Sequence, residues 1–189
     1  MDKAFVSQLS RMSRYVLIVV AVALLAPAGA IAADRSALER SARSAYSKLI
    51  AKVPAAKALS SDALAVLVFP KITKAGLIVG GQYGDGVLFK DGKVAGYYNT
   101  AGASYGLQAG AQKYGYAMFF MNERALNTLN SNEGFEVGVG PSVVVVDQGM
   151  GKSLTTMTAD NDIYAFIFSQ KGLMAGIGLQ GNKITKLKP

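Results

Sequence analysis

Residues 106–110 read Gly-Leu-Gln-Ala-Gly, residues 137–140 read Val-Gly-Val-Gly, and residues 175–178 read Ala-Gly-Ile-Gly. Alternate residues of a β-strand lie on one face of the sheet, so this spacing places glycine repeatedly on a single face. Glycine weakens a strand, and it is tolerated where a sheet bends or where another backbone comes close. The pattern therefore predicts a strongly curved sheet or a small barrel, and it does not indicate a catalytic loop.

The glycine content divides the chain. All of the 21 glycines except Gly29 lie between Gly76 and Gly181, and the stretch 30–75 contains none. The stretch before Gly76 is rich in charged residues, whereas the part after it alternates glycine with β-branched and aromatic residues. We therefore expect helices first and strands afterwards.

The glycine-free stretch predicts two helices. Residues 34–53 carry an apolar residue every three to four positions, which is the pattern of an amphipathic helix. Asp34 is the expected N-cap, and Pro54 ends the pattern. Residues 55–63 are expected to form a second, shorter helix.

The rest of the chain predicts short strands. Ala65–Phe69 is a continuous apolar run that suits a buried strand or the end of a helix, and Asp91-Gly92 is the clearest hairpin turn. One further helix is expected at 122–130, followed later by a polar loop at 148–162. The remaining strands are expected at 76–82, 86–90, 93–98, 103–111, 114–121, 135–139, 142–147, 163–169, 173–180 and 183–187. The sequence thus predicts an α+β fold, with N-terminal amphipathic helices packed on a curved, mostly antiparallel, glycine-rich β-sheet or barrel.

Residues 1–32 have the pattern of a cleavable signal peptide. Three basic residues precede the apolar run Tyr15–Leu25, and the small residues Ala30 and Ala32 suit cleavage before Ala33. The expected location is therefore periplasmic or secreted. The alternative is an uncleaved membrane anchor, because no charge interrupts the chain from Tyr15 to Ala33.

The basic composition points to anionic partners. Removal of residues 1–32 takes away three basic residues and one acidic residue, so the net charge falls from +8 to +6. Residues 33–189 have the length of a single domain. A positive excess favours phospholipid headgroups or other anionic surfaces, and nucleic acid is not an expected partner of an exported protein.

The chain contains no histidine and no cysteine. Ser-His-Asp and Cys-His machinery and the usual zinc sites are therefore excluded. Asp147 is the most suggestive carboxylate, but it is interpreted as the turn residue after a strand, and Asp160 and Asp162 as ordinary loop composition. Gly176, Gly178 and Gly181 have the spacing of a dinucleotide-binding loop. Only eight residues follow Gly181, however, which is too few for the helix that such a site needs. We expect no enzyme, no catalytic residue, no metal and no cofactor.

Four longer segments make the chain recognisable. It resembles the SYLF lipid-binding domain family, known in fungi as an actin-binding module, over about residues 55–187. The segments are Lys74–Leu88 (KAGLIVGGQYGDGVL), Tyr97–Gln112 (YYNTAGASYGLQAGAQ), Val137–Asp147 (VGVGPSVVVVD) and Ile163–Leu173 (IYAFIFSQKGL). The resemblance implies a non-enzymatic, membrane-associating domain. Eukaryotic relatives bind phosphoinositides, some bind actin filaments, and a basic amphipathic helix and surface lysines make the lipid contacts there.

These observations together give the expected function. We expect a membrane-surface-binding protein that recognises anionic phospholipid headgroups through Arg40, Arg43, Lys48, Lys52, Lys71 and Lys74. This expectation assumes that the helix and the Lys71–Lys74 turn share one face. One alternative is that the helix packs its apolar side on the sheet and that its charged side chains only face water. Another is a structural protein of the cell envelope that acts through self-association or a protein partner.

Overall fold

The computed structural model describes residues 28–76, 79–105, 110–131, 134–146, 161–169, 172–173 and 179–188. The chain divides into two compact units, Met1–Ala37 and Leu38–Pro189, and the sheet belongs to the second. The helices are α2 (Ala28–Lys52), α3 (Pro54–Asp62) and α4 (Glu123–Leu129). The strands are β1 (Ala65–Gly76), β2 (Val79–Lys90), β3 (Lys93–Tyr105), β4 (Gly110–Phe120), β5 (Phe135–Glu136), β6 (Val143–Val146), β7 (Ile163–Ser169), β8 (Gly172–Leu173) and β9 (Lys183–Lys186).

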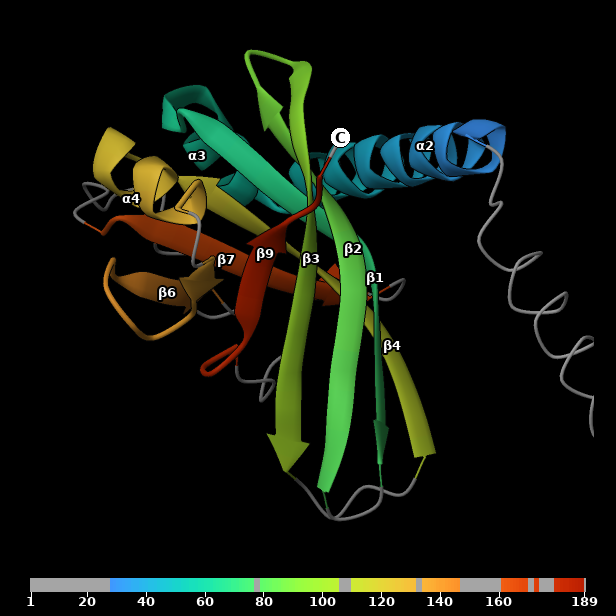
Figure 1. The fold of residues 1–189 in the computed structure, drawn as a ribbon. Helices are drawn as coiled ribbons and strands as arrows, with labels where there is room; N and C mark the ends of the chain where they lie inside the picture. The colour runs from blue at the N-terminus through green and yellow to red at the C-terminus, as the bar shows by residue number, and fades with distance from the viewer. Residues whose placement is uncertain are drawn as a thin grey trace, which may run out of the picture. The chain divides into compact units, whose positions relative to one another are not determined.

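Within the described residues, the strands form one nine-stranded sheet. Its order is β5-β9-β3-β2-β1-β4-β7-β6, and β8 pairs with β7. Every pair is antiparallel except β6 with β7, which is parallel. Figure 1 shows the sheet strongly twisted, with β1 to β4 as its longest strands. The predicted α+β class with a curved, mostly antiparallel sheet is confirmed.

The sheet has an inner face and an outer face, and each has its own core. Along β1, Leu67 and Phe69 point to the inner core, whereas Val66 and Val68 point to the outer core. The inner core is closed by α4 and by the segment around β5 and β9. The outer core is covered by α3 and by the part of α2 from Leu38 onward. Because both faces are covered here, this part of β1 is an uninterrupted apolar run.

Glycines on the inner face allow this curvature. A Cβ atom at Gly86 would lie 2.6 Å from the ring atom Cδ1 of Phe69. A Cβ atom at Gly102 would collide with the side chain of Asn182, which reaches across from the segment before β9. At both positions the absent side chain is what lets a neighbouring group approach the strand. The expectation of a glycine-lined, curved sheet is therefore correct.

Several predicted boundaries are wrong. Asp34 lies inside α2 and is not its N-cap, because the alanine-rich residues before it continue the helix. β1 continues through Pro70 by means of a bulge. Only residues 135–136 of the strand expected at 135–139 are a strand, since Gly138 and Gly140 have φ values of +100° and +94° in a turn. Of the quoted glycine segments, residues 106–109 and 175–178 lie outside the described residues.

Candidate functional site

Arg40, Lys48 and Lys52 form an exposed stripe on α2. All three are exposed, while Ala42 and Leu49 of the same helix are buried in the outer core. The three positions are eight and four residues apart, so they turn by about 80° and about 40° around the helix axis and extend over about 18 Å. The helix thus packs its apolar side on the sheet and presents a basic side to solvent. We call these three residues the helix stripe.

Arg43 has a different role from the helix stripe. Its guanidinium donates to Glu39 Oε1 at 3.0 Å and to the carbonyl oxygen of Gly92 at 3.1 Å. It also lies 4.9 Å from the centre of the Phe89 ring. These contacts fasten α2 to the hairpin between β2 and β3, whose turn residues Asp91 and Gly92 have φ values of 51° and 73°. Most N–H groups of the Arg43 guanidinium are therefore used in contacts within the fold.

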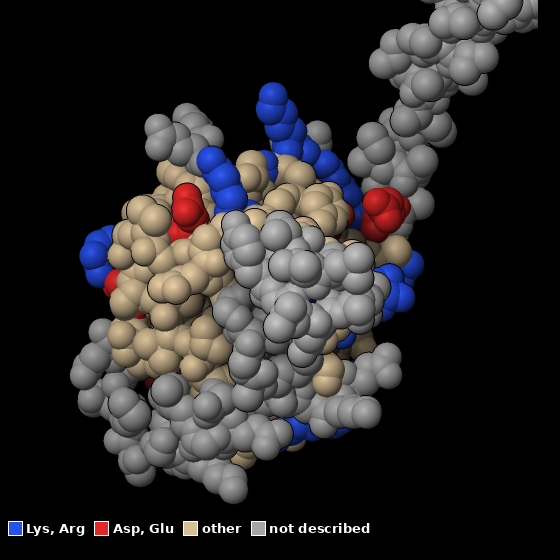
Figure 2. Space-filling view, turned by 90° about the horizontal axis from the view of Figure 1, so that it is seen from below, with Lys and Arg blue, Asp and Glu red and all other residues tan. Residues whose placement is uncertain are grey.

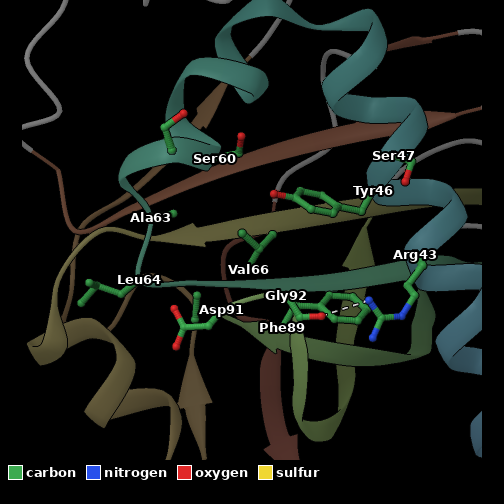
Figure 3. A pocket seen from close by; sticks show the side chains of 12 residues that line it. Arg43, Tyr46, Ser47, Ser60, Ala63, Leu64, Val66, Phe89, Asp91 and Gly92 are labelled. Atoms are coloured by element: carbon green, nitrogen blue, oxygen red, sulfur yellow. Dashed lines mark hydrogen bonds between the residues drawn. The ribbon is translucent and has the colours of Figure 1, made fainter.

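A half-open cavity of about 390 Å³ lies beside this contact (Figure 3). Its size falls in the range of small-molecule sites, and it combines an apolar floor with a rim of hydroxyl and charged groups. Burial raises the pKa of Tyr46 there, and a hydrogen bond with Ser60 partly opposes that rise. The cavity is lined by Arg43, Tyr46, Ser47, Ser60, Ser61, Ala63, Leu64, Ala65, Val66, Phe89, Asp91 and Gly92. Since Arg43 faces Glu39 and Asp91 lines the cavity, the cavity carries no excess of positive charge.

Lys71 and Lys74 lie beside the bulge in β1, on opposite faces of the sheet. Between Phe69 and Ile72, two residues of β1 oppose the single residue Gly115 of β4. Ile72 belongs to the inner core, and alternate residues share a face, so Lys74 lies on the inner side. Lys71 is exposed on the outer side, and Lys74 is half-buried. The assumption that these two lysines share one face with the helix is therefore not met for Lys74.

A row of exposed residues crosses the outer face of the sheet beyond the helices. Direct register partners run from Lys113 through Thr73, Tyr83 and Ala101 to Lys183, that is, from β4 through β1, β2 and β3 to β9. All five side chains are exposed, and Tyr83 is 56% exposed. Sequence reasoning missed this row, because neighbours in it come from five separate strands.

We call the exposed outer surface around this row the distal face. In Figure 1 it lies on the free lower halves of β1 to β4, away from α3. Its described members are Lys71, Thr73, Ala75, Gly81, Tyr83, Ala101, Ala103, Lys113 and Lys183. On the side of the molecule seen in Figure 2, Lys and Arg side chains lie at several separate places around the rim. Of the six predicted basic residues, three lie in the helix stripe and Lys71 lies on the distal face, while Arg43 and Lys74 belong to neither.

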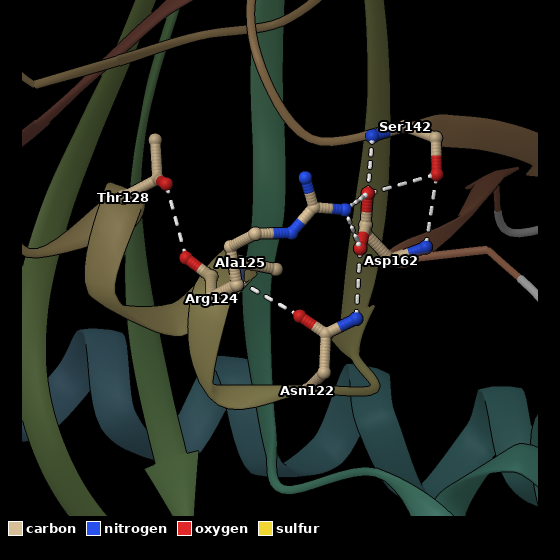
Figure 4. A network of polar contacts seen from close by, with 6 residues as sticks. All are labelled: Asn122, Arg124, Ala125, Thr128, Ser142 and Asp162. Carbon is tan, nitrogen blue, oxygen red and sulfur yellow. Dashed lines mark hydrogen bonds and ion pairs between the residues drawn. The ribbon is translucent and has the colours of Figure 1, made fainter.

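A network around Asp162 joins α4 to the strands (Figure 4). The carboxylate accepts hydrogen bonds from Asn122 Nδ2 at 2.8 Å, from the backbone N–H of Ser142 at 2.8 Å and from the guanidinium of Arg124 at 2.6 Å. The bonds from Asn122 and Ser142, together with that from Arg124, hold the pKa of Asp162 well below its usual range, although burial opposes them. Asn122 also caps α4 by accepting from the N–H of Ala125. Asp162 was expected to be an ordinary loop residue, but its carboxylate connects the start of α4 to the segment before β6.

The described residues offer little for catalysis. They contain no group of three or more acidic side chains arranged to hold a metal ion. Asp147, the most suggestive acid of the sequence, lies outside the described residues, as does Asp160. Of the helices that the structure describes, none is long and apolar enough to cross a membrane.

Comparison with known proteins agrees with the resemblance found in the sequence. The family model named Ysc84 and described as "Las17-binding protein actin regulator" matches residues 101–188. No curated protein matches the chain. The matched region begins in β3 at the distal face and contains β4, α4 and every later strand. Residues 101–188 are therefore similar to the Ysc84 family, in agreement with the SYLF resemblance of the sequence.

Proposed function

We propose that the chain is a non-enzymatic protein that binds the surface of membranes through anionic phospholipid headgroups. The observation that carries this proposal is the helix stripe, where Arg40, Lys48 and Lys52 are exposed on α2 while Ala42 and Leu49 of the same helix are buried. A basic residue close to an anionic bilayer contributes about 1 kcal/mol to binding. The family description, which names binding and regulation, supports a binding role.

We propose further that the protein acts in the bacterial envelope, as a periplasmic or secreted protein at a membrane surface. The support is the signal-like pattern of residues 1–32. In that location phosphatidylglycerol or a similar anionic lipid replaces the phosphoinositides and actin of eukaryotic relatives. Mass spectrometry of the protein from an envelope fraction tests this point. A mature chain that begins at Ala33 is expected, and an intact N-terminus would favour the membrane anchor instead.

Vesicle flotation tests the proposed function. The mature protein is expected to float with vesicles that contain phosphatidylglycerol and to stay behind with pure phosphatidylcholine. The double substitution Lys48→Glu and Lys52→Glu should abolish flotation, because it reverses two of the three charges of the helix stripe. The matched control reverses the exposed Lys57 and Lys93, which changes the net charge equally at other places. Equal loss in both variants would show that net charge alone governs binding, and flotation with neither kind of vesicle would refute the proposal.

Self-association is the second candidate function. The observation that favours it is the distal face, a flat exposed sheet surface of short side chains around Tyr83. Light scattering and crosslinking of the mature protein distinguish the two candidates. A monomer that binds vesicles would support membrane binding, whereas a stable oligomer that does not bind vesicles would support self-association.

A further inference from the structure

We propose that the distal face is a second surface for contact with an anionic lipid bilayer, and that Tyr83 enters the interface there. This inference rests on the membrane binding proposed above and specifies a surface for it. The distal face and the helix stripe share no residue, so their contributions can be measured separately. Three features carry the inference: unpaired lysines, an exposed aromatic ring, and short side chains around that ring.

The positive charge lies on the β1 and β4 side of the distal face. Neither strand contains an acidic residue, and both Lys71 and Lys113 are exposed. In the part of the chain that the structure describes, neither lysine forms an ion pair. The nearest acid on β2 is Asp85, which already accepts hydrogen bonds from Tyr83 Oη at 3.1 Å and from Asn99 Nδ2 at 3.2 Å.

The other end of the row is electrically different. Lys183 is the register partner of Glu136 of β5, and both are exposed. Opposite charges at directly paired positions attract each other and reduce the local potential. The distal face therefore has one end with excess positive charge, at Lys113, and one balanced end, at Lys183. The chain thus contains a natural pair of lysines for comparison.

Short side chains surround Tyr83 in the row. Its neighbours in the row are Thr73 and Ala101, and Gly81 precedes it by two residues on the same face of β2. Tyrosine is enriched where a membrane meets water, because its ring prefers the apolar side and its hydroxyl the polar side. Tyr83 is 56% exposed, its row neighbours are short, and its hydroxyl is held by Asp85, so the ring can reach the headgroup region while the lysines contact phosphates.

A second copy of the chain fits this surface less well. The row spans four strand spacings, roughly 19 Å, with a lysine at each end. Two such faces stacked in the same direction would place Lys113 against Lys113, and like charges at short distance repel. Stacked in the opposite direction, they would place Lys113 against the end where Glu136 already offsets Lys183. An anionic bilayer meets the same lysines with the opposite charge. The charge of the face therefore favours the bilayer.

A single-tryptophan experiment tests the inference, because the natural chain contains no tryptophan. Tyr83→Trp reports on the distal face, Ser44→Trp on the exposed side of α2 near the helix stripe, and Val139→Trp on an exposed turn elsewhere. Each full-length mature variant is mixed with vesicles containing phosphatidylglycerol and brominated lipid. We expect a blue-shifted, quenched emission for Tyr83→Trp and an unchanged emission for Val139→Trp.

The outcomes separate this inference from the proposed function. Quenching of Ser44→Trp without quenching of Tyr83→Trp would overturn the distal face and leave membrane binding in place. Quenching of none of the three would refute membrane binding itself. A blue-shifted Tyr83→Trp emission before vesicles are added would show that the chain or a second copy already covers the face, which also overturns the inference.

The two lysines at the ends of the row give a second, independent measurement. Lys113→Gln should weaken binding to phosphatidylglycerol vesicles about fivefold, and Lys183→Gln less than twofold, because Glu136 already offsets its charge. Both substitutions are at exposed positions and remove the same charge. No loss from Lys113→Gln, or an equal loss from both, would contradict the inference.

Discussion

The two halves of the long strands β1 to β4 differ in what covers them. In the half near the helices both faces are buried, with Leu67 and Phe69 in the inner core and Val66 and Val68 under α2 and α3. In the distal half only the inner face is buried, and the outer face is exposed from Thr73 onward. The same strands therefore pass from a covered to an uncovered environment along their length.

This difference explains the composition of the strands. A strand covered on both faces reads as a continuous apolar run, as in Ala65–Phe69 and Tyr116–Phe120. A strand covered on one face alternates, and here it alternates exposed short residues with inner glycines or polar groups. Inside the distal half, Tyr114 Oη donates to Gln82 Oε1 at 2.6 Å, and Gln82 in turn donates to Asn182. The distal half is therefore held by a buried polar network, and the described residues of its outer face are exposed.

The largest predicted effect lies in the covered half. Phe119 is fully buried, with its ring centre 5.2 Å from that of Phe166 and 6.1 Å from that of Tyr46 on α2. Phe119→Ala should lower the free energy of unfolding by about 3–5 kcal/mol, because it leaves a cavity between helix and sheet. Urea denaturation measures the loss. Tyr83→Ala on the distal face is the control, expected to change stability by less than about 0.5 kcal/mol.

The second prediction concerns Asp162, whose network ties α4 to the covered half. Asp162→Ala should cost about 1–3 kcal/mol at pH 7, since it removes the buried acceptor that Asn122, Arg124 and Ser142 share. The folded-state pKa of Asp162 lies below the unfolded value of about 3.9, so its stabilisation is complete above that pH and is lost as the pH falls further.

Urea denaturation of parent and Asp162→Ala across pH checks the sign. The difference in stability between the two proteins should be constant from pH 7 to about pH 5 and should shrink steadily below about pH 4. Arg124→Gln is the milder companion, because the Arg124 side chain is 72% exposed and an exposed ion pair contributes little. A difference that grows towards low pH would contradict the assignment of the network.

Much of this fold could be predicted from the sequence. The glycine boundary, the Asp91-Gly92 hairpin, the strand at 163–169 and the apolar stripe of α2 all appear in the structure where they were expected. These features are local, and each depends on periodicity or on turn chemistry within a few residues. The strand ends were less predictable, because residues 79–82 and 86–90, expected in two strands, belong to the single strand β2, as the sheet register shows.

The site could be predicted only in part. Arg40, Lys48 and Lys52 lie together because helical spacing is visible in the sequence. Lys71 and Lys74 lie on opposite faces because they are three residues apart in a strand, and this was missed because residues 71–74 were expected to form a turn. The distal face depends on register across five strands, and the role of Asp162 depends on partners up to 40 residues away. Such long-range relations are absent from any single stretch of sequence.

A third prediction compares glycines of the two halves, beginning with a glycine that packs. Gly86 lies under the ring of Phe69, with its Cβ position 2.6 Å from the nearest ring atom. Gly86→Ala should cost about 1–3 kcal/mol, because the ring or the strand must move to accept the methyl group. Thermal denaturation measures the loss. An unchanged midpoint would mean that the inner core is loosely packed at this point.

The smallest predicted effect has the opposite sign and lies on the distal face. Gly81 occupies the same strand as Gly86, but no atom lies within 4 Å of its Cβ position, and its φ is not among the positive values. Gly81→Ala should therefore stabilise the fold by about 0.5–1 kcal/mol, since alanine restricts the unfolded chain and fits an open strand position. Denaturation of Gly81→Ala beside Gly86→Ala makes the comparison within one strand. The short methyl group should also leave vesicle binding unchanged. A loss of stability at Gly81 would show that another segment of the chain or a second copy covers the distal face, and the contrast between the two halves would then no longer hold.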